Sequence, residues 1–220
     1  MKTKGPIHVD PKAYWDARFA SGDWERKGGR SQTRRFAESQ MGLLNIPPSF
    51  TGTILDFGCG LGDAIPVYRT SYPNASLIGM DISGTAIEMS RRTYGHLARF
   101  FQGDTDSVPE ADIIIASNIL EHCADDIQIA AELLKRCNDL FVITPYLETL
   151  IPHGEHVHSY DENHFNQIGP YSYMIFESKG WGDFSWPVRI AFYLKNMCRK
   201  LMGMRKVSGP KQIMFHFKSV

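Results

Sequence analysis

Short, nearly continuous apolar runs alternate with amphipathic stretches through the middle of the chain. Such runs predict buried strands, and apolar residues at helical spacing predict helices with one buried face. Strands are expected at residues 53–57, 77–80, 99–101, 112–116 and 140–143, and helices at 63–71, 83–94 and 125–137. This alternation is typical of a doubly wound α/β fold, in which helices cover both faces of a mostly parallel sheet.

The N-terminal part of the chain departs from this alternation. Residues 14–19 predict a short helix, residues 21–31 a mobile loop, and residues 32–44 a longer helix that ends before two prolines. We therefore expect an N-terminal cap or lid at 1–45, followed by the main domain at 46–220.

The C-terminal third differs as well, and we expect an insertion around 145–210 that forms the substrate region. Asp161 is expected to cap a short helix, and residues 181–187 and 212–217 predict strands, the second at the sheet edge. Residues 189–202 predict a basic amphipathic helix. Packing against the core is the simplest role for that helix; membrane-surface contact and dimer contact are the alternatives.

Composition and charge narrow the class of protein. Lys plus Arg number 24, Asp plus Glu number 24, and the net charge is zero, which argues against nucleic acid as the main partner. No apolar run reaches the roughly 18–20 residues of a transmembrane helix, and the first residues lack the apolar core of a signal peptide. The four cysteines, which form no Cys-x-x-Cys pair, indicate free thiols in a reducing cytoplasm.

A glycine-rich loop follows the first expected strand of the main domain. Its sequence, Asp56-Phe57-Gly58-Cys59-Gly60-Leu61-Gly62, places a glycine at every second position. Glycine is used where the backbone turns with positive φ or lies close against a ligand. Such a loop between a parallel strand and a helix is typical of nucleotide sites in doubly wound sheets.

One acidic residue, Asp81, ends the next strand about one βαβ unit later. In a nucleotide site such a carboxylate accepts hydrogen bonds from ribose hydroxyls, each worth roughly 1.5–3 kcal/mol. Alone, Asp81 is equally well explained as a solvated residue at a strand end. Its combination with the glycine loop favours the ribose role.

These segments resemble the class I S-adenosylmethionine-dependent methyltransferases in their small-molecule form. The glycine loop resembles their first motif, Asp81 the second, Gly103-Asp104 the third, and residues 112–122 the fourth. The resemblance implies a Rossmann-like, seven-stranded, mostly parallel sheet with an antiparallel C-terminal strand. It also implies S-adenosyl-L-methionine as the cofactor and S-adenosyl-L-homocysteine as its product. The cofactor-binding residues that it implies are Asp56, Gly58, Cys59, Gly60, Asp81, Ile82, Asp104, Thr105 and Asn118, with Tyr14, Trp15, Arg18 and Gln32 from the lid.

Other ligands and substrates fit less well. A dinucleotide fingerprint needs Gly-x-Gly-x-x-Gly, but here the third glycine comes one position early and Asp63 stands in its place. The fourth motif reads Ser117-Asn118-Ile119-Leu120, which differs from the Asn/Asp-Pro-Pro-Tyr motif of enzymes that methylate base amines. Base methylation also requires extraction of the target from its stack.

Histidines supply the candidate catalytic groups. We expect His156 to act as general base, with His153 and His122 as further candidates, because ligands bind beyond the carboxyl ends of parallel strands. For His122, a structural role in bonding loop backbone is slightly favoured over catalysis. His-x-x-His-x-His, at residues 153–158, also offers imidazoles to one metal ion, and helix capping is a third role. We assign no metal ligand from the sequence.

The expected function is methyl transfer to a small-molecule or glycan-type acceptor. Oxygen is favoured over nitrogen, because a hydroxyl must lose its proton and a neutral imidazole accepts one near pH 7. The alternatives are N-methylation of a small metabolite, a donor-binding partner subunit without activity, and a dinucleotide oxidoreductase.

Overall fold

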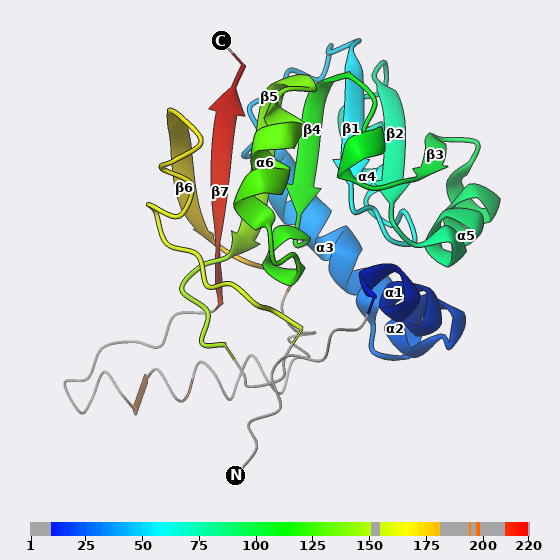
Figure 1. Cartoon of the computed structure of the whole chain (residues 1–220), viewed down its shortest axis with the longest axis horizontal. Helices are drawn as coiled ribbons and strands as arrows, with labels where there is room; N and C mark the ends of the chain where they lie inside the picture. The colour runs from blue at the N-terminus through cyan, green and yellow to red at the C-terminus, as the bar shows by residue number, and fades with distance from the viewer. Residues whose placement is uncertain (1–9, 151–154, 181–193, 195–196, 199–209, 220) are drawn as a thin grey trace.

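A computed structural model describes residues 10–150, 155–180, 194, 197–198 and 210–219. These residues form a seven-stranded sheet in the order β3-β2-β1-β4-β5-β7-β6 (Figure 1). The strands are β1 (Thr53–Phe57), β2 (Ser76–Asp81), β3 (Arg99–Gln102), β4 (Ala111–Ser117), β5 (Cys137–Pro145), β6 (Tyr171–Glu177) and β7 (Lys211–Lys218). The first five strands are parallel, whereas β7 runs antiparallel to both β5 and β6. The predicted fold class, including the antiparallel C-terminal strand, is confirmed.

Helices cover both faces of this sheet. They are α1 (Pro11–Ala20), α2 (Asp23–Arg26), α3 (Gly29–Met41), α4 (Ile65–Ser71), α5 (Gly84–Tyr94) and α6 (Asp126–Leu134), with 3-10 turns η1 (Thr105–Ser107) and η2 (Leu120–His122). Ala130 and Leu133 of α6 pack on one face, and Ala37 of α3 and Tyr68 of α4 pack on the other. Because β1 and β4 are covered on both sides, the buried residues at their centres, Ile54, Leu55 and 113–116, are apolar.

The carboxyl ends of β1 and β4 point toward the N-terminal helices (Figure 1). Residues of β1 pair in register with both neighbours, as Ile54 does with Leu77 of β2 and Ile113 of β4. The loops after β1, β2 and β4 therefore emerge side by side at one sheet edge. This is the place at which ligands bind in doubly wound sheets.

The N-terminal segment is more ordered than the sequence pattern predicts. The loop expected at 21–31 contains α2 and the start of α3, which follow Gly22 and Gly28 in left-handed conformation, φ 67° and 79°. These two glycines allow sharp turns without strain. The prediction of a loop was wrong because glycines favour turns, and the two glycines here flank a short helix, α2, that is only four residues long.

The C-terminal part corrects several further predictions. Residues 162–168 form turns in place of the short helix expected after Asp161, whose carboxylate accepts from the backbone N–H of Asn163 at 2.9 Å. Strand β6 was not predicted, and it takes the edge position that was expected for β7. The strand expected at 181–187 lies outside the described residues, as does most of the helix expected at 189–202. In the described part of the chain, no helix is long and apolar enough to span a membrane.

Candidate functional site

A cavity of about 380 Å³ opens at the carboxyl ends of β1, β2 and β4. Its floor is the glycine loop after β1, and its walls come from the ends of β2 and β4, from residues 103–105 and from helices α1 to α3. Segments far apart in the sequence thus enclose one space large enough for a nucleoside-sized ligand.

The glycine loop adopts backbone angles that other residues rarely reach. Gly58, Gly60 and Gly62 have φ values of 75°, 51° and 75°. A Cβ at Gly58 would lie 2.6 Å from Cγ1 of Ile119, so the loop also packs too closely on the end of β4 for any side chain. The backbone N–H groups of Gly58 and Cys59 donate to the Met80 carbonyl at 2.8 and 2.9 Å, which fixes the loop against β2.

Asp81 holds the same loop from the other side. One of its carboxylate oxygens accepts from the Gly60 N–H at 2.7 Å, and the second accepts from the Ser83 N–H at 2.8 Å. Burial raises the pKa of Asp81 to about 6, and burial together with Asp81 raises the pKa of Asp56 to about 7. Each carboxylate oxygen has a second lone pair, so Asp81 can brace the loop and accept from a ligand hydroxyl at once.

Most of the predicted cofactor residues line this cavity. They are Asp56, Gly58, Cys59, Gly60, Asp81, Ile82, Asp104, Thr105, Asn118, Trp15 and Gln32. A polar network at the cavity rim was not predicted: Ser117 donates to Gln40 at 3.0 Å, and Gln212 donates to Asn118 at 2.8 Å. Gln40 and Gln212 are fully buried, which a sequence pattern cannot show for isolated glutamines.

Helix α1 lies across the cavity and is fastened at both sides. Asp16 accepts from the Ser83 hydroxyl at 2.6 Å and from the Thr85 N–H at 3.0 Å, at the start of α5. On its other side, the Tyr14 hydroxyl donates to the Glu155 carboxylate at 2.6 Å, and Arg18 forms an ion pair with the same carboxylate.

Two predicted cofactor residues, Tyr14 and Arg18, are therefore absent from the described cavity lining. Their contacts join α1 to the segment after β5. Aromatic residues of the lid take the inner positions instead: Phe19 and Trp24 line the cavity with Trp15, and neither was predicted. The Arg18 guanidinium lies over the Trp15 and Trp24 rings, at 5.7 and 5.5 Å from their centroids.

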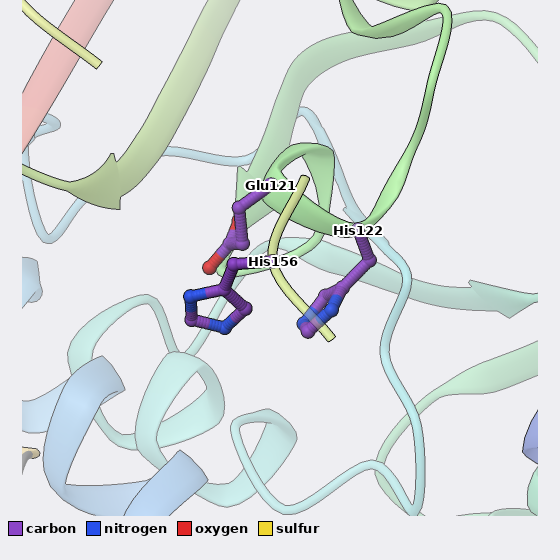
Figure 2. A group of neighbouring side chains, drawn as sticks. All are labelled: Glu121, His122 and His156. Atoms are coloured by element: carbon purple, nitrogen blue, oxygen red, sulfur yellow. The ribbon is translucent and has the colours of Figure 1, made fainter. Parts of the chain in front are cut away.

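The predicted catalytic histidines lie in different places. His122 lines the cavity, and its ring centroid lies 4.8 Å from that of His156 (Figure 2). His156 is not among the described lining residues, and a Glu148 oxygen lies 2.5 Å from its Nδ1. Burial and the neighbouring His156 lower the pKa of His122 to about 4. His153 lies outside the described residues.

The histidines at 158 and 164 contact residues at, and just before, the start of α6. His158 contacts the Cys123 carbonyl at 3.0 Å, and His164 lies 2.6 Å from the Asp126 carboxylate at the start of α6. The Tyr160 hydroxyl donates to the same carboxylate at 2.9 Å. This second cluster fastens the segment after β5 to α6.

Comparisons with known proteins agree with this architecture. The family described as "Methyltransferase domain" matches residues 54–139. A ribosomal RNA small subunit methyltransferase C from Stutzerimonas stutzeri is 29% identical over 126 residues, which cover 48% of this chain and 37% of that protein. The chain spans less than two fifths of the length of the curated relatives that it matches.

Two solved structures share the fold. A chain in the complex between the Haloferax volcanii Trm112 methyltransferase activator and the putative methyltransferase aligns with a TM-score of 0.65 at 17% identity, covering 93% of this chain and 97% of that one. The plantazolicin methyltransferase BpumL, solved with a triazolic desmethylPZN analog and S-adenosylhomocysteine (SAH), aligns with a TM-score of 0.57 at 18% identity, covering 93% and 91%. The family match over residues 54–139, the strand order and these neighbours agree, and this part of the chain therefore has the fold of a class I methyltransferase domain, a family whose methyl donor is S-adenosylmethionine.

Proposed function

We propose that the chain transfers the methyl group of S-adenosylmethionine to a hydroxyl of a small-molecule or glycan-type acceptor. The observation that carries this proposal is one cavity that is lined by the glycine loop and Asp81 and also by His122. In the reaction, the acceptor oxygen attacks the methyl carbon and the carbon–sulfur bond breaks. Its electron pair stays on the sulfur, which becomes the neutral thioether of S-adenosylhomocysteine, and the hydroxyl releases its proton to solvent.

The donor side of the proposal rests on charge and hydrogen-bonding capacity. We assign Asp81 to the ribose hydroxyls and Asp56 to the ammonium of the aminoacid end, and the presence of both carboxylates in the cavity lining supports this assignment. Two buried carboxylates with raised pKa values favour a cationic ligand, because a nearby positive charge stabilises their ionised forms.

We further propose that residues 1–45 act as a lid and that residues around 145–210 shape the acceptor region. The contacts of Tyr14 and Arg18 with Glu155 join these two parts. A lid that excludes water and aligns the methyl group with the acceptor oxygen contributes through positioning, which supplies roughly 7–11 kcal/mol in well-oriented reactions.

The choice of a small acceptor rests on the enclosed cavity and on the sequence. Trp15, Phe19 and Trp24 line the lid side of the cavity, and the formal net charge is zero. BpumL supports a small acceptor, since it is solved with a plantazolicin analog. The similarity to a ribosomal RNA methyltransferase makes RNA the second candidate, although the fourth motif lacks Asn/Asp-Pro-Pro-Tyr.

The test combines binding and turnover. Calorimetry with S-adenosylhomocysteine should give saturable binding to one site, and S-adenosylmethionine with a panel of hydroxyl, amine and RNA acceptors should release S-adenosylhomocysteine for a hydroxyl compound. Release with RNA or amines alone would contradict the acceptor assignment. Binding without turnover on any acceptor would favour the partner-subunit alternative, and absence of binding would overturn the proposal.

A further inference from the structure

Glu121, in the turn η2 after β4, is buried in an unusual way. Its side chain is fully inaccessible, and neither carboxylate oxygen has a hydrogen-bond partner. Among the described residues, no other carboxylate has both oxygens in this condition. A buried polar group without partners costs roughly 1–3 kcal/mol, and more when charged, so such a group in a folded protein requires an explanation.

Two imidazoles lie directly beside this carboxylate. One ligand atom each from Glu121, His122 and His156 lies within 4.8 Å of the other two (Figure 2). A cation with ligands at about 2.0–2.2 Å requires ligand atoms no more than about 4.4 Å apart, so small side-chain rotations are sufficient to close the site.

The outer partners of both histidines set their tautomers. Nδ1 of His122 lies 3.1 Å from the Glu155 carbonyl oxygen, and Nδ1 of His156 lies 2.5 Å from the Glu148 carboxylate. Both oxygens accept hydrogen bonds, so Nδ1 is the ring nitrogen that donates, and Nε2 is the ring nitrogen that a cation would use. Metal-binding histidines have this arrangement, in which the second ring nitrogen donates to a carboxylate or a carbonyl.

In the second cluster, around Asp126, the carboxylate is hydrogen-bonded to neighbouring side chains. Asp126 accepts from Tyr160 at 2.9 Å and lies 2.6 Å from His164. The carboxylate of that cluster already has partners within the protein. Glu121 has none, so the two clusters differ at the atom that matters for binding a cation.

We propose that Glu121, His122 and His156 together bind one divalent transition-metal cation at the wall of the cavity. Two imidazoles and one carboxylate suit such a cation and leave coordination positions open. Because His122 lines the cavity, those positions are accessible to the acceptor hydroxyl. The role in methyl transfer rests on the proposed function; binding of the cation does not.

The cation would also account for the proton of the acceptor hydroxyl, because His122 would use its ring nitrogen as a metal ligand instead of as a proton acceptor. A bound cation lowers the pKa of a coordinated hydroxyl, so that its proton leaves to solvent before the oxygen attacks the methyl carbon. The methyl carbon–sulfur bond then breaks as described above.

Cobalt(II) alone is a suitable probe, used with the full chain free of any polyhistidine tag and first treated with EDTA. Calorimetry should show one equivalent bound, with visible d–d absorption bands that indicate imidazole ligands. Glu121→Gln and His156→Ala should abolish this binding, and Glu148→Gln should weaken it about 10–100-fold, as is typical for outer partners. His158→Gln, in the second cluster, is the matched control and should bind Co2+ as the wild type does.

Folding of the variants is monitored separately. Co2+ should raise the melting temperature of the wild type and of His158→Gln, but leave that of Glu121→Gln unchanged, and all variants should bind S-adenosylhomocysteine. The inference is overturned if wild-type protein binds no Co2+, or if His158→Gln removes the binding while Glu121→Gln retains it. Binding of S-adenosylhomocysteine in the presence of EDTA tests the proposed function on its own. If the donor product binds and Co2+ does not, only the cation site is refuted. If Co2+ binds and the donor product does not, only the proposed function is refuted.

Discussion

The donor end of the cavity and its histidine end are built in opposite ways. The donor end is one short stretch, Asp56 to Gly62, together with Asp81, and its shape is fixed by backbone angles and backbone hydrogen bonds. The histidine end brings together η2, Glu148, residues 155–158 and helix α1, which are held mostly by side-chain contacts. We infer that the donor end has little freedom to change, whereas the histidine end can be altered by exchanging a few contacts.

The substitution with the largest expected effect is Gly58→Ala, in the glycine loop of the donor end. The new methyl group would clash with Ile119, and φ at this position is 75°. Left-handed strain of about 1–2 kcal/mol and overpacking of about 1–3 kcal/mol add up to at least a thirtyfold loss in S-adenosylhomocysteine affinity by calorimetry. Gly42→Ala is the control, because no other atom lies within 4 Å of the place its new methyl group would take, and α3 ends there with ordinary angles. Equal affinities in both variants would show that the loop is not rigid.

Asp81→Asn tests the carboxylate of the donor end. The amide group keeps one acceptor but presents N–H groups toward the Gly60 or Ser83 N–H, and it loses the charge. We expect S-adenosylhomocysteine to bind roughly 10–150-fold more weakly, corresponding to about 1.5–3 kcal/mol. Asp106→Asn, on the exposed side of η1, should change the affinity less than about twofold. A similar loss in both variants would point to general electrostatics in place of a direct contact.

Acidification should also weaken donor binding, because it removes the negative charges of Asp81 and Asp56. The pKa of Asp81 is about 6 and that of Asp56 about 7, so both carboxylates are ionised at pH 8 and progressively protonated toward pH 5.5. The ionised forms bind the hydroxyls and the ammonium, so the affinity should fall with falling pH, by at least about threefold between pH 8 and 5.5. Calorimetry over this range, with Asp81→Asn as a variant that titrates less steeply, checks this; a flat wild-type profile would contradict it.

The smallest expected effect is at the lid. Glu155→Ala removes the partner of both Tyr14 and Arg18 but keeps the backbone carbonyl that faces His122. The pair is partly exposed and therefore worth at most about 1 kcal/mol, so donor affinity should fall no more than about fivefold. Glu132→Ala, which removes an exposed pair with Lys135, is the control and should have no effect on donor affinity. A loss as large as that of Asp81→Asn would show that the two ends are not independent.

The same contrast explains what the sequence could predict. The strands β1 to β5, the Ser83 N-cap and the glycine loop follow from neighbouring residues, and the structure has them close to the expected places. Gln40, Gln212 and Glu121 could not be identified, because their roles depend on burial and on partners far along the chain. Strand β6 was missed because it lies at the sheet edge with several exposed apolar residues, such as Tyr173, and lacks the continuous burial of the inner strands.

The contact between Gly58 and Ile119 has a consequence for the spacing of the reaction. Ile119 stands two residues before Glu121 and packs against the glycine loop that would hold the donor. One aliphatic side chain thus touches the glycine loop and lies two residues from Glu121, so we infer that its size influences the spacing between the donor loop and the histidine turn. Removal of one methyl group there, as in Ile119→Val, would alter this spacing without changing a residue that is proposed to bind the donor or the cation.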